Sequence, residues 1–176
     1  MANKAKKRKP GRKLPPLSRT ELLPLVAAQA RDQSLRAHMA LVMVRSGHGD
    51  LAILGELLRT VFVTYFVYKS GGEVSYFEHF VEAESALKAG MDRGEAQGIW
   101  AVSNAGASAL EIVLMLQDKH LANRPIYVIE RAKEQLRVVL DKGAFPDLAR
   151  DYEMASRVVT VTSDVCEGDE REATCV

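Results

Sequence analysis

The chain has 176 residues, of which 47% are hydrophobic and 27% are charged, and its net charge is +1. These values are ordinary for a soluble globular protein, and the length predicts a single domain. The only two cysteines are Cys166 and Cys175. They do not form the framework of pairs that a small secreted domain needs, so we expect a reducing, cytoplasmic compartment.

The net charge of +1 is the balance of segments with very different charge. Residues 1–19 hold eight Lys or Arg and no acid, whereas residues 164–176 hold five acids and one Arg. A chain polarised in this way is expected to meet anionic partners through its basic end. Residues 1–17, the basic head, are rich in Lys and Pro and cannot bury enough apolar surface to offset their ordering entropy. We therefore predict that they are disordered.

Seven side chains of the basic head are the candidate nucleic-acid-binding residues. They are Lys4, Lys6, Lys7, Arg8, Lys9, Arg12 and Lys13. Contacts of such side chains with the phosphates of duplex DNA release condensed counterions, which gives affinity without sequence specificity. The stretch Pro10-Gly11-Arg12-Lys13 also resembles arms that enter the minor groove. The alternative interpretation is a tail that only solubilises the protein.

Two apolar segments resemble targeting or membrane segments. The run Leu22–Ala28 follows a basic start as in a signal peptide, but it is short and contains Pro24, so we do not expect export. The run Leu51–Tyr68 is near the lower length limit for a membrane span. Because Glu56 and Arg59 lie three residues apart and can pair on one helical face, a buried helix is the better explanation and no membrane partner is expected.

The first helix has two alternative starting points. Ser18-Arg19-Thr20-Glu21 has the form of a capping box, which would begin the helix at Ser18. Pro24 would then remove a backbone donor from the helix, so the alternative is a helix that begins at Pro24 itself. In either case we expect the helix to run towards Arg45, with a break near residues 32–34, and to end at Gly47.

The second helix is predicted to follow Asp50, a good N-cap, and to stop at residues 70–72. Its apolar residues cover nearly the whole circumference. A helix of this kind is either central in its bundle or part of a subunit interface, and on this basis we predict a homodimer. Ser75 is the predicted cap of the third helix, which ends in a row of glycines. That row, Gly90, Gly94 and Gly98, predicts either close packing or fraying after residue 88.

Two more helices are predicted, from Ser103 to Leu121 and from Pro125 to Gly143. The expected inward stripes are Leu110, Val113, Leu114 and Leu121 in the first, and Ile126, Ile129, Ala132, Leu136, Val139 and Leu140 in the second. Short loops between four to five helices predict an all-α fold, an antiparallel helical bundle over residues 18–143. Residues 144–176 are predicted to form a weakly ordered acidic tail, with a short helix near 147–154 and strand character at 158–162.

Catalytic and metal-binding signatures are weak. His79, Glu78 and Glu82 could share a face toward a metal, but a di-metal bundle needs two such motifs and two further acids. No base is placed to activate a serine or cysteine nucleophile. We therefore expect a non-enzymatic protein without metal or cofactor.

The fifth helix is the natural candidate for reading DNA bases. Its bases are Arg131, Lys133 and Arg137, and its acids Glu130, Glu134 and Asp141 offset them. The turn before it lacks the glycine common in helix-turn-helix units. A sequence-specific reader is therefore one hypothesis beside non-specific phosphate contact.

Three stretches follow the Lys-, Arg- and Pro-rich start: GDLAILGELLRTVFVTYFVYKSG, YFEHFVEAESALKAGMDRGEAQGIW and LMLQDKHLANRPIYVIERAKEQL. In helix lengths and loop positions they resemble a group of small helical proteins of bacteriophages and integrated elements of proteobacteria, catalogued as Fis-family transcriptional regulators. The resemblance covers about residues 35–142. It implies a mobile-element origin, a bacterial cytoplasm and a regulatory role.

Together these features favour a non-enzymatic, DNA-associated regulatory or accessory protein of a phage or mobile element, which contacts duplex DNA through its basic head. The alternative is a protein-interaction module, an inhibitor or adaptor of a host protein, with no role in nucleic-acid binding.

Overall fold

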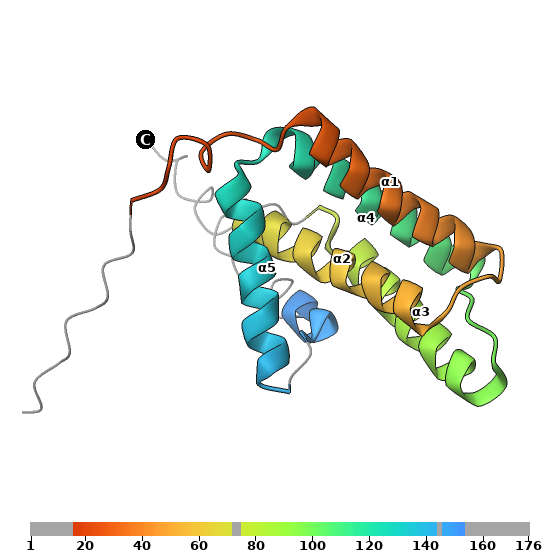
Figure 1. Ribbon diagram of the computed structural model, residues 1–176. Helices are drawn as coiled ribbons and strands as arrows, with labels where there is room; N and C mark the ends of the chain where they lie inside the picture. Colours follow the sequence, from red (N-terminus) through yellow and green to blue (C-terminus); the bar gives the residue numbers. More distant parts are fainter. Residues whose placement is uncertain (1–15, 72–74, 144–145, 154–176) are drawn as a thin grey trace, which may run out of the picture.

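The computed structural model describes residues 16–71, 75–143 and 146–153. Helix is the only repeating secondary structure in these ranges, which confirms the predicted all-α class. The helices are α1 (Ala27–Arg45), α2 (Leu51–Ser70), α3 (Phe77–Gln97), α4 (Asn104–Asn123) and α5 (Ile126–Asp141). Figure 1 shows α1 to α4 side by side, each running back along the one before it, with α5 crossing the end of α2.

Helix α2 lies at the centre of the protein. It contacts α1, α3, α4 and α5, and Leu54, Leu57 and Val61 are completely buried in it. The ion pair that the sequence predicted within this helix, Arg59 with Glu56 at 3.9 Å, lies on an exposed edge. By length and composition α2 is the one described helix that could cross a membrane, yet 56% of its most apolar window is buried inside the protein. Packing within the chain therefore accounts for its apolar circumference.

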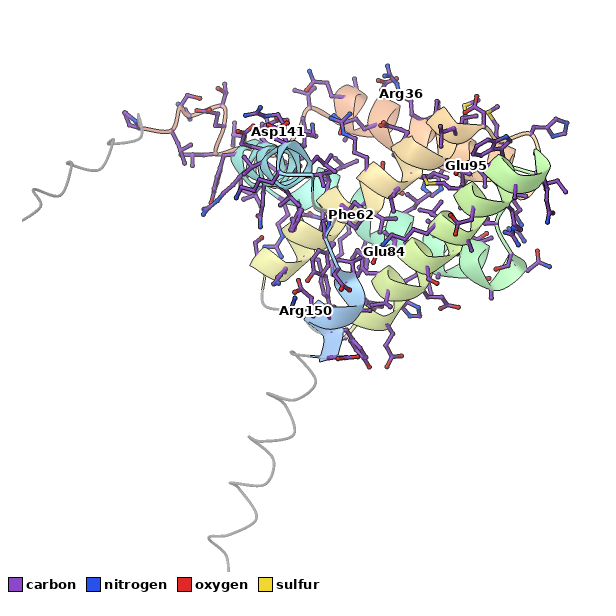
Figure 2. The ribbon with its side chains drawn as sticks, turned by 90° about the horizontal axis from the view of Figure 1, so that it is seen from below. Arg36, Phe62, Glu84, Glu95, Asp141 and Arg150 are labelled. Carbon is purple, nitrogen blue, oxygen red and sulfur yellow. The ribbon has the colours of Figure 1, made fainter. Side chains whose placement is uncertain are left out.

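Aromatic rings join α2 to α3. Tyr65 meets Phe77 edge-on, with ring centroids 5.4 Å apart, and Tyr68 lies 5.3 Å from Phe80. All four rings are buried, and such pairs add about 0.5–1.5 kcal/mol each beyond the burial of their surface. Figure 2 shows Phe62 in the same interior, whereas Arg36 lies on the outside of α1. These aromatic residues are core residues rather than a surface for stacking on bases.

Both predicted starting points of α1 are wrong, because the helix begins at Ala27. The capping box does form: the Ser18 N–H donates to Glu21 Oε2 at 2.6 Å, and the Glu21 N–H donates to Ser18 Oγ at 3.3 Å. These bonds close a turn and not a helix. Pro24 forms an isolated bridge with Pro125 instead, so the chain is extended there and enters the helix three residues later. The predicted break near residues 32–34 is absent from α1.

Of the predicted N-caps Asp50 and Ser75, only Asp50 is confirmed, and Ser103, the predicted start of the fourth helix, is the N-cap of α4. Asp50 accepts a hydrogen bond from the Ile53 N–H at 2.7 Å, and Ser103 accepts one from the Gly106 N–H at 3.2 Å. Ser75 does not cap α3, whose N-cap is Tyr76. The Tyr76 N–H donates to the Tyr68 hydroxyl at 3.0 Å. A side chain of α2 therefore ties down the start of α3.

The glycine row on α3 is a surface of close packing, and the predicted fraying after residue 88 does not occur. A Cβ at Gly90 would meet the Ala101 carbonyl oxygen at 3.0 Å, and a Cβ at Gly94 would overlap the ring of Trp100. Gly98 ends the helix with a left-handed φ of 72°, a conformation that favours glycine. The chain thus turns back along its own helix, and the ring of Trp100 packs directly on the backbone at Gly94.

Substitution of Gly94 tests this packing. We expect Gly94→Ala to lower the free energy of unfolding by about 1–3 kcal/mol, because the ring of Trp100 must move. Gly55→Ala in α2 is the matched control. Nothing lies within 4 Å of a Cβ there, so this variant should gain up to about 1 kcal/mol from helix propensity. Urea unfolding of both variants measures the difference, and equal effects would contradict the packing role of Gly94.

The packed body extends beyond residue 143, where the sequence placed its end. Residues 148–153 form a short helix, and Leu148 is completely buried in the main core. Asp151 of this helix accepts hydrogen bonds from the Tyr65 hydroxyl at 2.6 Å and from Lys69 Nζ at 2.7 Å. The predicted strand at 158–162 and both cysteines lie outside the described residues. In α5, Ile129, Ala132 and Leu136 are buried as predicted, whereas Leu140 is 41% exposed.

The contacts of Asp151 make stability depend on pH. Partial burial acts to raise the pKa of this carboxyl, but the hydrogen bonds from Lys69 and Tyr65 outweigh it and hold the pKa below its ordinary value of 3.8. Burial raises the pKa of the Tyr65 hydroxyl, which therefore remains a donor. A lowered carboxyl pKa stabilises the fold above the unfolded-state pKa of about 3.9, and the effect is lost as pH falls through the folded-state pKa.

We therefore expect Asp151→Asn to lose about 1–3 kcal/mol of unfolding free energy at pH 6. The gap between this variant and the wild type should narrow below about pH 4. Glu153→Gln, an exposed position on the same short helix, should stay close to wild type at both pH values. Chemical unfolding at pH 6 and pH 3.5 measures the difference. A gap that is constant with pH would contradict the role of the charged carboxylate.

Candidate functional site

The segment before α1 is attached to the start of α5. The Ile126 N–H donates to the Leu23 carbonyl at 2.9 Å, and the Tyr127 N–H donates to the Glu21 carbonyl at 3.1 Å. The first N–H groups of a helix have no partner within the helix, so backbone carbonyls of the entering chain satisfy two of them here. The described chain therefore begins against the first turn of α5.

None of the seven predicted nucleic-acid-binding residues lies within the described residues. Lys4, Lys6, Lys7, Arg8, Lys9, Arg12 and Lys13 all precede residue 16. The structure does locate the residues that directly follow the basic head in the sequence. Since residues 21–23 are bonded to α5, this segment lies beside the N-terminal turn of α5 and the C-terminal end of α2 (Figure 1).

A groove of about 620 Å³ lies at this corner, between the end of α2 and α5. Three of its lining residues are cationic, Lys69, Arg124 and Arg131, and none is acidic. The other lining residues are Phe66, Ser70, Pro125, Tyr127, Val128, Ala132 and Gln135. Cationic groups beside aromatic rings are the side chains that bind phosphates and bases of nucleic acids. We name this surface the α2–α5 groove.

Two contacts fix the cations of the α2–α5 groove. Arg124 lies over Gly71, where an added Cβ would come within 2.5 Å of Arg124 Nη2. Lys69 Nζ lies 5.5 Å from the centre of the Tyr65 ring and donates to Asp151, which neutralises part of its charge. Gly71, which has no side chain, and the buried ring of Tyr65 therefore position the two cations of the groove.

The other bases of α5 are neutralised on the helix itself. Lys133 Nζ lies 2.9 Å from Glu130, and Arg137 bonds both Glu134, at 2.6 Å, and Asp141, at 3.2 Å. The hydrogen bond from Arg137 lowers the pKa of Glu134, so this pair remains ionised. These contacts weigh against the hypothesis that α5 reads bases, because a recognition helix needs cations available to DNA.

A second hollow, of about 200 Å³, lies between α1, α2, α4 and α5. Its polar wall includes Gln117, whose Oε1 is buried and has no hydrogen-bond partner among the described residues. Three Lys or Arg side chains line it, and each is paired within its own helix: Arg36 with Asp32 at 2.9 Å, Arg59 with Glu56 at 3.9 Å, and Lys133 with Glu130 at 2.9 Å. This hollow therefore presents little net charge, in contrast to the α2–α5 groove.

Two of the three residues considered for metal binding, Glu78 and His79, make other contacts. Glu78 accepts a hydrogen bond from the Tyr152 hydroxyl at 2.6 Å, which ties α3 to the short helix at residues 148–153. His79 packs beside the ring of Tyr76. Within the described ranges, no three His, Cys, Asp or Glu side chains are grouped so that they could hold a metal ion.

The sequence did not predict the cations of the α2–α5 groove as a group. Lys69 lies in the last turn of α2, Arg124 in a loop, and Arg131 on α5, so helical periodicity does not join them. The only local signal was the position of Lys69 and Arg124 at the C-terminal ends of α2 and α4, where cations are common. No family model, curated protein or solved structure matches this chain.

Proposed function

We propose that this protein is a non-enzymatic, DNA-associated regulatory or accessory protein of a phage or mobile element, acting in the bacterial cytoplasm. It consists of an antiparallel helical bundle that carries a flexible basic head and an acidic tail, and it acts as a dimer. The basic head and the α2–α5 groove together contact the phosphates of duplex DNA without reading its sequence.

One observation supports this proposal above all: a groove lined by three cations and no acid lies where the basic head joins the body. The head alone could be a solubilising tail. The groove adds cations on the folded part of the chain, near the residues that follow the basic head in the sequence. Several cations in one protein suit binding to a polyanion, since each neutralised phosphate releases counterions.

Removal of residues 1–17 tests the role of the basic head. We expect the truncated protein to lose binding to duplex DNA at about 50 mM salt and to lose most of its salt dependence, because most phosphate contacts are gone. Fluorescence anisotropy with a labelled duplex measures both. Undiminished affinity after truncation would assign the contact to the folded body alone. If the intact protein does not bind DNA at low salt, the alternative function, a protein-interaction module for a host protein, is favoured.

The groove is tested separately by Arg131→Gln. We expect this variant to bind DNA several-fold more weakly and to reduce the salt slope by about one phosphate contact. Arg137→Gln is the matched control, because it removes the same charge from the same helix at a residue that Glu134 and Asp141 already neutralise. Equal losses in the two variants would show that overall charge, and not the groove, determines affinity.

A further inference from the structure

Helix α1 exposes a stripe of large apolar side chains on the side away from the core. Leu35 is 60% exposed, Met39 is 56% exposed and Val42 is 65% exposed. Their spacing of four and three residues places them on one face of the helix. The buried residues of α1, Ala37, Leu41 and Val44, lie on the opposite face. Contiguous apolar side chains at such exposure mark interaction surfaces in soluble proteins.

Helix α4 adds a fourth apolar residue to this surface. Met115 is 66% exposed. Two contacts fix how α4 lies along α1: Arg45 Nη1 lies 2.6 Å from Glu111 Oε1, and His38 Nε2 lies 3.0 Å from Asp118 Oδ2. The helices run in opposite directions, so Met115 lies between these two contacts, level with Val42. We name the stripe together with Met115 the α1–α4 face.

The charges that border the α1–α4 face are divided between the two helices. The nitrogen partners, Arg45 and His38, both belong to α1, and the carboxylates, Glu111 and Asp118, both belong to α4. All four side chains are between 38% and 55% exposed, so each can still meet a second partner. A surface with nitrogen donors on one side of an apolar strip and acceptors on the other is complementary to itself.

We propose that the α1–α4 face binds a second copy of this chain about a two-fold axis parallel to the two helices. This axis lays α1 of each subunit over α4 of the other. Arg45 then faces Glu111 of the partner subunit, and His38 faces Asp118 of the partner subunit. Met39 and Val42 pack against Met115 of the partner subunit. An axis perpendicular to the helices would place α1 on α1 and α4 on α4, with bases facing bases and acids facing acids. An isologous interface of the first kind therefore satisfies charge and apolar contact together.

This inference deepens the dimer of the proposed function by naming its surface, and it replaces the sequence-based reason for dimerisation. Helix α2, whose apolar circumference suggested a subunit interface, is covered by the other helices of its own chain. Because the interface does not involve the basic head, dimerisation can be measured without DNA. Failure of DNA binding and failure of the interface are therefore separate results.

The first experiment is light scattering of the full chain at micromolar concentration. We expect a mass twice that of the 19.4 kDa chain. Val42→Glu should shift the dissociation constant at least tenfold toward monomer. Val138→Glu on α5, which is 39% exposed and lies on a helix outside the face, should leave the mass unchanged. Circular dichroism checks that both variants are folded. A monomeric wild type, or a dimer that Val42→Glu leaves intact, would overturn the proposal.

The second experiment tests the alignment of the subunits. Arg45→Glu alone places glutamates opposite glutamates across the interface, and Glu111→Arg alone places arginines opposite arginines, so each variant should be monomeric. An equimolar mixture should restore the dimer, since every contact across the interface then joins opposite charges. The pair within each chain stays broken in the mixture, so restoration reports contact between subunits only. Two monomeric variants that do not associate when mixed would refute this axis.

Discussion

The apolar side chains of helix α2 must be buried on nearly every side, and the positions of the other helices follow from this requirement. Its buried side chains face α1, α3, α4 and α5 in turn, and completely buried leucines such as Leu54 and Leu57 contribute about 1.5–3 kcal/mol each to folding. Even Thr64, which is buried, satisfies its hydroxyl by donating to the Thr60 carbonyl of the same helix at 2.8 Å. The short helix at residues 148–153 adds contacts with α2 through Asp151, which accepts hydrogen bonds from Tyr65 and Lys69.

The basic side chains around the two hollows differ in their acidic neighbours. On α5, Lys133 and Arg137 are held by acids one turn away, and the bases around the polar hollow are held in the same way. Exposed pairs of this kind add little to stability, but they cancel the field that a polyanion would meet. The α2–α5 groove has no acid in its lining, although Lys69 is paired with Asp151 at 2.7 Å, whereas Glu56 is part of the lining of the polar hollow.

Much of the architecture could be predicted from the sequence, because it depends on local signals. The helical periodicity of the apolar residues and the caps at Asp50 and Ser103 act within a few residues of each other. The predictions are wrong where contacts with a segment far away in the sequence determine where a helix begins. The Ser18–Glu21 capping box forms its bonds, but Pro24 pairs with Pro125, a hundred residues away, and the helix begins later. The start of α3 depends on the Tyr68 hydroxyl, and the α2–α5 groove joins residues from three separate segments. Helical periodicity in the sequence does not indicate these contacts between distant segments.

The attachment of residues 21–23 to α5 has a consequence for a symmetric pair of subunits. It holds the root of the basic head at one end of the body, the end where α1 begins and α4 finishes. Rotation about an axis parallel to these helices keeps the two equivalent ends on the same side. In such a pair, the two places where residues 21–23 are bonded to α5 lie at the same end, and the helices of the two subunits set the distance between them.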